Sequence, residues 1–267
     1  MCLILFSYDI HKEYRLVFAA NRDEYYRRPT QSLGTWSEAP EMIAGRDLQA
    51  GGTWLGVSRN GKFAAITNFR DPSERLADPL SRGSLVAAFL RDGQSAAAYV
   101  RNLDMPEART RYNGFNLLAG DASGLWYFSN RGPAPRRLSP GLYGLSNHLL
   151  DTPWPKVETG KARLQKVLQH PGSLDPEALF AMLTDRTQPP DSQLPHTGVE
   201  LGWERTLSPM FIASPDYGTR SSSLLIVRRN GQVAFLERSY DDHRTRRFDF
   251  AIPPEAAIPP PEFDRHT

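Results

Sequence analysis

The sequence is poor in cysteine, since its 267 residues contain only Cys2. A single cysteine excludes an internal disulfide, and no Cys/His spacing in the chain offers a structural zinc site. The chain also lacks a large excess of either charge sign, because 32 basic and 30 acidic residues leave a formal charge of +2. This total indicates neither a nucleic-acid nor a membrane-surface partner. We expect a cytoplasmic protein without a metal site.

Long hydrophobic runs are absent as well. The apolar run from Cys2 to Phe6 is shorter than the ~7–15 residues of a secretory signal core. No other segment approaches the ~18 uninterrupted apolar residues of a membrane span, so we expect none.

Common catalytic and phosphate-binding signatures are also missing. The chain has no Gly-x-Ser-x-Gly elbow and no His-Glu-x-x-His pair. Residues 56–62 (GVSRNGK) resemble a phosphate-binding loop, but Phe63 replaces the hydroxyl that would hold magnesium, and a strand hairpin is the wrong context.

What the chain does contain is 40% apolar residues, enough for one large core. Strands are predicted at 2–8, 14–20, 53–58, 62–68, 115–119, 125–129, 142–146, 210–213, 222–227, 233–240 and 245–250. Helices are predicted at 81–91, 95–103, 155–168 and 176–184, with an exposed loop at 188–202. Asn-Gly pairs at 60–61 and 230–231 predict hairpin turns. Without a regular strand-helix alternation, an antiparallel α+β layered domain over 1–251 fits best, followed by a proline-rich tail at 252–267.

The position of Cys2 makes it a candidate nucleophile. If Met1 is removed, a thiol and a free α-amine belong to one residue. The amine, with a pKa of ~7.7–8.0, then accepts the proton of a thiol with a pKa of ~8.5. The alternative is a small buried hydrophobic residue on a first strand.

Several motifs, in order along the chain, resemble one family. They are MCLI (1–4), NRDEY (21–25), GGTWLG (51–56), TN (67–68), YNGFNL (112–117), NRG (130–132), YGLSN (143–147), TPW (152–154), YGTR (217–220) and ER (237–238). The pattern resembles the NRDE family of Transport and Golgi organization protein 2-like proteins. It is more distantly similar to N-terminal-nucleophile cysteine amidases of the penicillin V acylase and bile salt hydrolase type. The resemblance implies a four-layered αββα sandwich of two largely antiparallel sheets.

The resemblance also implies a catalytic set: Cys2, Arg22, Asp23, Asn68, Asn147 and Arg220. In it, Asp23 orients the terminal amine and Arg22 lowers the pKa of the thiol. Asn68 and Asn147 donate to an oxyanion, and Arg220 holds the site electrostatically or grips a carboxylate or phosphate. The alternatives are a rim ion pair between Arg22 and Asp23, strand-end amides and a solvated arginine.

Further residues are candidates for ligand binding. Trp54 and Trp154 either line a pocket or pack in the core. His148 is either an iron ligand or proton-transfer group, or a structural histidine.

Two functions therefore compete. One is a hydrolase that uses Cys2 to cut an amide or thioester. The other is a carrier that binds haem, acyl-CoA or lipid in the same cleft without catalysis, as the family's links to haem trafficking and lipid homeostasis imply. The expected partner is a small molecule, with no cofactor required and haem only as cargo. A protein-interaction scaffold ranks last, because the chain has no coiled coil or repeat array.

Overall fold

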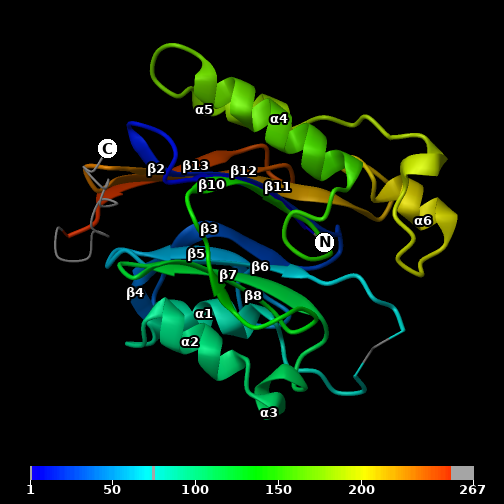
Figure 1. Cartoon of the computed structure of the whole chain (residues 1–267), viewed down its shortest axis with the longest axis horizontal. Helices are drawn as coiled ribbons and strands as arrows, with labels where there is room; N and C mark the ends of the chain where they lie inside the picture. The colour runs from blue at the N-terminus through cyan, green and yellow to red at the C-terminus, as the bar shows by residue number, and fades with distance from the viewer. Residues whose placement is uncertain (1, 74–75, 254–267) are drawn as a thin grey trace, which may run out of the picture.

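The strands of the computed structural model form two antiparallel sheets that lie face to face (Figure 1). Residues 2–73 and 76–253 are described. The first sheet has the order β10-β1-β2-β11-β12-β13 and the second the order β3-β4-β5-β6-β7-β8-β9. Bounds in the first sheet are β1 (Cys2–Tyr8), β2 (Tyr14–Tyr25), β10 (Gly141–Leu145), β11 (Tyr217–Arg228), β12 (Gln232–Ser239) and β13 (Thr245–Ala251). Bounds in the second are β3 (Thr30–Trp36), β4 (Ala39–Asp47), β5 (Leu55–Ser58), β6 (Phe63–Asn68), β7 (Phe115–Asp121), β8 (Gly124–Ser129) and β9 (Arg136–Arg137).

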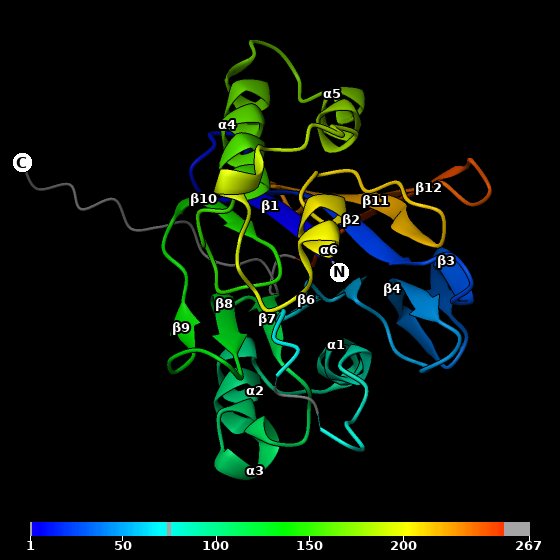
Figure 2. The same cartoon turned by 90° about the vertical axis from the view of Figure 1, so that its right-hand side faces the viewer.

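Helices cover the outer face of each sheet. Beside the second sheet lie α1 (Gly83–Arg91), α2 (Ala96–Leu103) and α3 (Pro106–Arg109). The first sheet is covered by α4 (Pro155–Gln169) and α5 (Pro176–Leu183), while η1 (Asp191–Gln193) and α6 (Leu201–Thr206) follow in the next segment. Figure 2 shows α6 beside the start of α4 and near the N-terminal end of the chain. The predicted αββα sandwich is confirmed by this layering.

β1 shows why the layers form. Ile4 and Phe6 pack into the core between the sheets, whereas Leu3 and Leu5 pack against α4 and α5. Successive side chains of a strand point to opposite faces, so a strand that is covered on both faces needs an uninterrupted apolar run. The opening sequence supplies that run.

The two Asn-Gly hairpins are confirmed. Gly61 has a φ of 92° and Gly231 a φ of 84°, values that favour glycine, and each turn joins two paired strands. The four predicted helices also form, although the first begins at Gly83 rather than at position 81.

Other predictions are wrong in part. Residues 30–47 form β3 and β4, which were not predicted, because their polar, partly exposed sequences lack a strong strand pattern. The segment 210–213 is not a strand; Ala213 makes only an isolated bridge to Gly218. α6 begins in the segment predicted as a loop. β2 runs five residues beyond its predicted end, so the polar group at 21–25 lies inside a paired strand.

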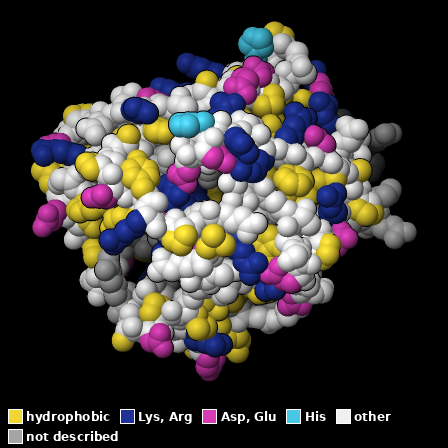
Figure 3. All heavy atoms as spheres, turned by 180° about the vertical axis from the view of Figure 1, so that it is seen from behind, with side chains coloured by type: hydrophobic (Ala, Val, Ile, Leu, Met, Phe, Trp, Pro, Cys, Tyr) yellow, Lys and Arg dark blue, Asp and Glu magenta, His cyan; other side chains and the backbone are white. Residues whose placement is uncertain are grey.

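The face of the molecule that Figure 3 shows carries both charge signs in a mixed arrangement, as expected from the near-zero net charge. Within residues 2–73 and 76–253, no helix combines the length and apolar character needed to cross a membrane. Of the predicted tail, residues 254–267 lie outside the described residues.

Candidate functional site

Strand register brings Cys2 and Arg22 together. Cys2 in β1 pairs with Arg22 in β2, and Arg22 pairs in turn with Ser221 in β11. Paired residues share a face and neighbouring strands are about 4.8 Å apart, so these three residues form a short row across the first sheet.

The row forms one wall of a cleft of about 340 Å³ at one end of the sandwich. The facing wall includes Thr53, Trp54, Ile66 and Asn68 from the second sheet and its loops. Other charged residues that line the cleft are Asp23, Glu24, Arg28, Arg46, Asp47, Arg82 and Glu237.

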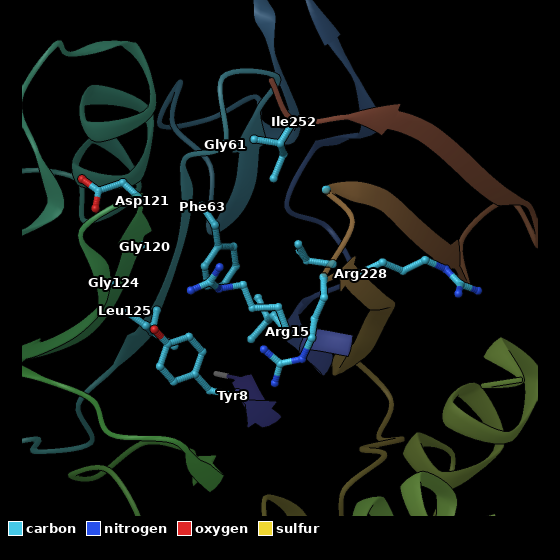
Figure 4. Close-up of a pocket in the computed structure, with 14 residues that line it drawn as sticks. Tyr8, Arg15, Gly61, Phe63, Gly120, Asp121, Gly124, Leu125, Arg228 and Ile252 are labelled. Atoms are coloured by element: carbon cyan, nitrogen blue, oxygen red, sulfur yellow. The ribbon is translucent and has the colours of Figure 1, made fainter. Parts of the chain in front are cut away.

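A second hollow, of about 70 Å³, is lined by the other end of β1, where Tyr8 lies (Figure 4). Tyr8 and the ring of Phe63 border it, while the side chains of Asp121 and Arg228 extend away from its centre. It contains no cysteine and is much smaller than the Cys2 cleft, which is therefore the candidate site.

The Cys2 thiol is only 7% exposed. Burial raises its pKa above the ordinary value, and the Asp23 carboxylate acts in the same direction. The charge of Arg22 and the backbone N–H of Asp23 act in the opposite direction. Arg22 therefore lowers the pKa of the thiol as predicted, although burial makes the larger contribution and the pKa is raised overall. The resting thiol is protonated at neutral pH.

Arg22 is also 7% exposed, and its Nη1 is a buried atom without a hydrogen-bond partner. Its side chain lines the cleft. An unmade bond of a buried charged donor is costly, and this donor belongs to the residue that is paired with Cys2.

Asp23 is 2% exposed and bonds to the neighbouring strand. The hydroxyl of Thr219 donates to its Oδ1 at 2.6 Å, and the N–H of Ile212 donates to the Thr219 hydroxyl at 2.9 Å. Burial raises the pKa of Asp23, whereas the charge of the N-terminal amine, the charge of Lys156, the Thr219 bond and the charge of Arg22 lower it. The rim ion pair between Arg22 and Asp23 is not formed.

Asn68 and Asn147 lie differently with respect to the cleft. Asn68 lines the cleft, as predicted for an oxyanion donor. Asn147 is fully buried, and its Nδ2 donates to the backbone carbonyl of Asn68 at 3.0 Å, so its amide is already engaged. The structure corrects the prediction for Asn147, which positions Asn68 and does not line the cleft.

Arg220 is also not part of the cleft wall. It lies at the register shift of β11 between Thr219 and Ser221. Its guanidinium binds Asp241 and donates at 3.0 Å to the backbone carbonyls of Tyr25 and Arg28. The bulge directs the side chain away from Cys2, and Arg220 instead holds the turn between β2 and β3.

Of the aromatic candidates, only Trp54 lines the cleft. The Trp154 ring lies under the Arg70 guanidinium at 4.9 Å. His148 accepts or donates a bond to Thr152 through Nδ1 at 2.8 Å, and its pKa is lowered by burial. Neither Trp154 nor His148 lines the cleft, and the described part of the chain contains no cluster of three metal-binding side chains.

The sequence analysis missed several charged residues at or near the site, and two of them bear most directly on its electrostatics. Glu237 lines the cleft, and its Oε1 accepts the N–H of Leu33 from the other sheet at 2.7 Å. Lys156 is 6% exposed and lies behind Asp23. No local pattern marks either residue, although Glu237 falls within the ER motif at 237–238.

The class of protein follows from these features: a four-layered αββα sandwich with a cysteine at the start of β1, facing a cleft between the sheets. A family model described as Transport and Golgi organisation 2 matches residues 1–242, and the chain belongs to this family.

Curated relatives match along nearly their whole length. The Transport and Golgi organization 2 homolog of Mus musculus is 37% identical, over 93% of this chain and 96% of its own. The Homo sapiens homolog is 37% identical, over 94% and 99%, and the Drosophila melanogaster protein is 28% identical, over 90% and 92%.

Among solved structures, an N-acylethanolamine-hydrolyzing acid amidase ortholog from Caenorhabditis elegans aligns with a TM-score of 0.49 at 10% identity, covering 85% of this chain and 92% of its own. A mutant conjugated bile acid hydrolase from Clostridium perfringens aligns with a TM-score of 0.43 at 11% identity, over 94% and 92%. The layering described above follows from this chain's own strand order and helix packing.

Proposed function

We propose that this protein is a hydrolase of amide or thioester bonds in which Cys2 is the nucleophile. The observation that carries the proposal is the pairing of the chain's single thiol with a buried guanidinium whose Nη1 has no partner. A thiolate, or the oxyanion of a tetrahedral intermediate, is the kind of anion that such a guanidinium stabilises.

The reaction begins with removal of Met1, which frees the α-amine of Cys2. The amine takes the thiol proton, and the sulfur attacks the substrate carbonyl carbon, forming a C–S bond. The tetrahedral oxyanion then collapses: the C=O bond re-forms and the bond to the leaving amine or thiol breaks. The leaving group takes the proton from the ammonium of Cys2. Water then attacks the thioester, releases the acid and regenerates the thiol.

The side chains around Cys2 have distinct parts in this scheme. Arg22 stabilises developing negative charge, and the backbone N–H of Asp23 acts on the sulfur in the same sense. The Asn68 amide donates to the oxyanion, a contact worth roughly 3–4 kcal/mol in a preorganised site. A thiol whose pKa is raised by burial needs an adjacent base, which the amine of the same residue supplies.

The walls of the cleft fit a substrate with apolar and polar parts. Trp54 and Ile66 offer apolar surface, while Arg22 offers a cationic group. The volume of about 340 Å³ lies within the usual range for small-molecule sites, which is about 300–1,000 Å³. An acyl chain with a polar or anionic end is the substrate class that these walls favour.

The test uses protein whose loss of Met1 has been verified by intact mass. Hydrolysis of a panel of fatty-acyl amides and thioesters is compared between the wild type, Cys2→Ser and Cys2→Ala. We expect turnover by the wild type and none by Cys2→Ala. Binding of an acyl ligand or haem by wild type and Cys2→Ala alike, without turnover by either, would establish carriage and overturn the proposal.

A further inference from the structure

Lys156 is a buried cation on the helix side of the first sheet. It is the second residue of α4, is 6% exposed, and donates through Nζ to the carbonyl of Leu207 at 2.8 Å. Ammonium groups are almost never fully buried without a compensating charge. A neutral carbonyl alone does not supply that charge.

Asp23 is a nearby carboxylate whose charge acts on Lys156. Alternation along β2 places Asp23 on the same face as Asn21, whose Nδ2 donates to the carbonyls of Leu183 in α5 and of Met210. This face therefore points into the helix layer, which contains Lys156. Each charge acts on the other: Lys156 lowers the pKa of Asp23, and Asp23 raises the pKa of Lys156.

Other titratable groups near Lys156 come from separate parts of the chain. Arg70, which follows β6, lowers the pKa of Lys156, whereas Cys2 in β1 and Glu204 in α6 raise it. Burial outweighs these contributions and lowers the pKa of Lys156 to about 8. Glu204 is largely engaged elsewhere, because its Oε2 binds Arg70 Nη1 at 2.7 Å and its Oε1 accepts two bonds from Thr197.

Apolar packing closes this region to water. Leu207, Ile212 and Tyr217 form a buried cluster beside Lys156 and Asp23, and the adjoining cavity measures about 10 Å³. Such a cavity has room for about one water molecule at most. The charges of Lys156 and Asp23 must therefore be balanced mainly by protein groups.

We propose that Lys156 is a positioning residue of the Cys2 site that keeps Asp23 ionised behind the nucleophile. The inference rests on the proposed function and on the role that the family resemblance implies for Asp23, which is to orient the amine of Cys2. Without the ammonium, Asp23 is left as a buried carboxylate that has lost a counter-charge, so it takes up a proton at a higher pH.

The experiment follows the titration of Asp23 itself. Protein labelled with ¹³C at aspartate carboxyls is titrated by NMR, and Asp23→Asn identifies the resonance by its loss. Lys156→Met is expected to increase the proton affinity of Asp23 at least tenfold, whereas Lys156→Arg, which keeps the charge, leaves it close to wild type. An unchanged Asp23 titration in Lys156→Met would overturn the proposal.

Lys156→Gln keeps a donor for the Leu207 carbonyl but removes the charge, so it serves if the methionine variant does not fold. The Lys156→Gln variant is expected to give the same rise in the proton affinity of Asp23, and wild-type titration in it overturns the proposal equally. The readout does not depend on catalysis. If Asp23 responds but no substrate is turned over, only the proposed function fails; if turnover occurs while Asp23 does not respond, only the role of Lys156 fails.

Discussion

Cys2 and Arg22 lie on paired strands, and burial affects their chemistry differently. The thiol becomes harder to ionise, while the guanidinium has a buried Nη1 without a hydrogen-bond partner. Arginine is effectively always protonated in proteins, so the pair can stabilise negative charge at the sulfur whenever it forms.

This pairing predicts the pH dependence of thiol alkylation. Arg22 favours the thiolate, so Arg22→Met should raise the pKa of Cys2 and move the midpoint of iodoacetamide alkylation to higher pH. The measurement is the alkylation rate against pH, and it is unambiguous because the chain has one cysteine.

Arg22→Lys is the matched control, because it keeps the positive charge and should stay near the wild-type midpoint. Equal midpoints in Arg22→Met and the wild type would show that the guanidinium does not act on the thiol.

At the residue scale, the sequence was sufficient to predict the site residues that lie in continuous, well-paired strands. Cys2, Arg22 and Asp23 were found because antiparallel pairing of adjacent strands fixes their neighbours. Arg220 was misplaced because its direction depends on a bulge. Asn147 was misplaced because its amide bonds to a carbonyl that is 79 residues away in sequence.

Among the elements, the β5–β6 hairpin and α1 show why residues 56–62 resemble a phosphate-binding loop without being one. Lys62 is buried, and its Nζ donates to the carbonyls of Phe89 at 3.3 Å and Gln94 at 2.8 Å, and to that of Asp92. The ammonium thus satisfies carbonyls at the C-terminal end of α1, where the helix dipole favours a cation.

Lys62→Met should therefore destabilise the protein by about 2 kcal/mol, because it keeps the apolar stem but leaves buried carbonyls without a donor. Urea unfolding of this variant measures the loss, with exposed Lys12→Met as the control expected to change little. If the two variants lose the same stability, Lys62 does not cap α1.

Strong local patterns account for the elements that were predicted correctly. Asn-Gly turns and apolar runs marked β1, β5, β6, β11 and β12, whereas β3 and β4 carry polar residues on a partly exposed edge of the second sheet. Their pairing is set by neighbouring strands, and a single sequence does not show that context.

For the whole molecule, local patterns predicted only an antiparallel layered domain, and the four-layer form came from the family resemblance. Contacts between the sheets create the site. Glu237 makes one of these contacts, because its carboxylate accepts the N–H of Leu33 in β3 while the residue lines the cleft.

Glu237 should make stability depend on pH. Burial raises its pKa in the folded protein above the unfolded value, so its contribution is complete below the unfolded pKa and is lost as the pH rises through the folded pKa. Glu237→Gln keeps an acceptor for Leu33 and should be more stable than wild type at neutral pH, by about 1 kcal/mol.

Chemical unfolding between pH 4 and 8, roughly the range where carboxylate linkage acts, measures this difference. Exposed Glu41→Gln serves as the control and should follow the wild type. A Glu237→Gln variant with the wild-type slope of stability against pH would show that Glu237 does not titrate as described.

The central claim is that Cys2 accepts an acyl group in the cleft between the sheets. Intact-mass spectrometry of Met1-processed protein, quenched in acid after mixing with p-nitrophenyl butyrate, tests it most directly. The account predicts a single butyryl adduct on the wild type that decays with time and is absent from Cys2→Ala. No adduct on the wild type, or an equal adduct on Cys2→Ala, would contradict it.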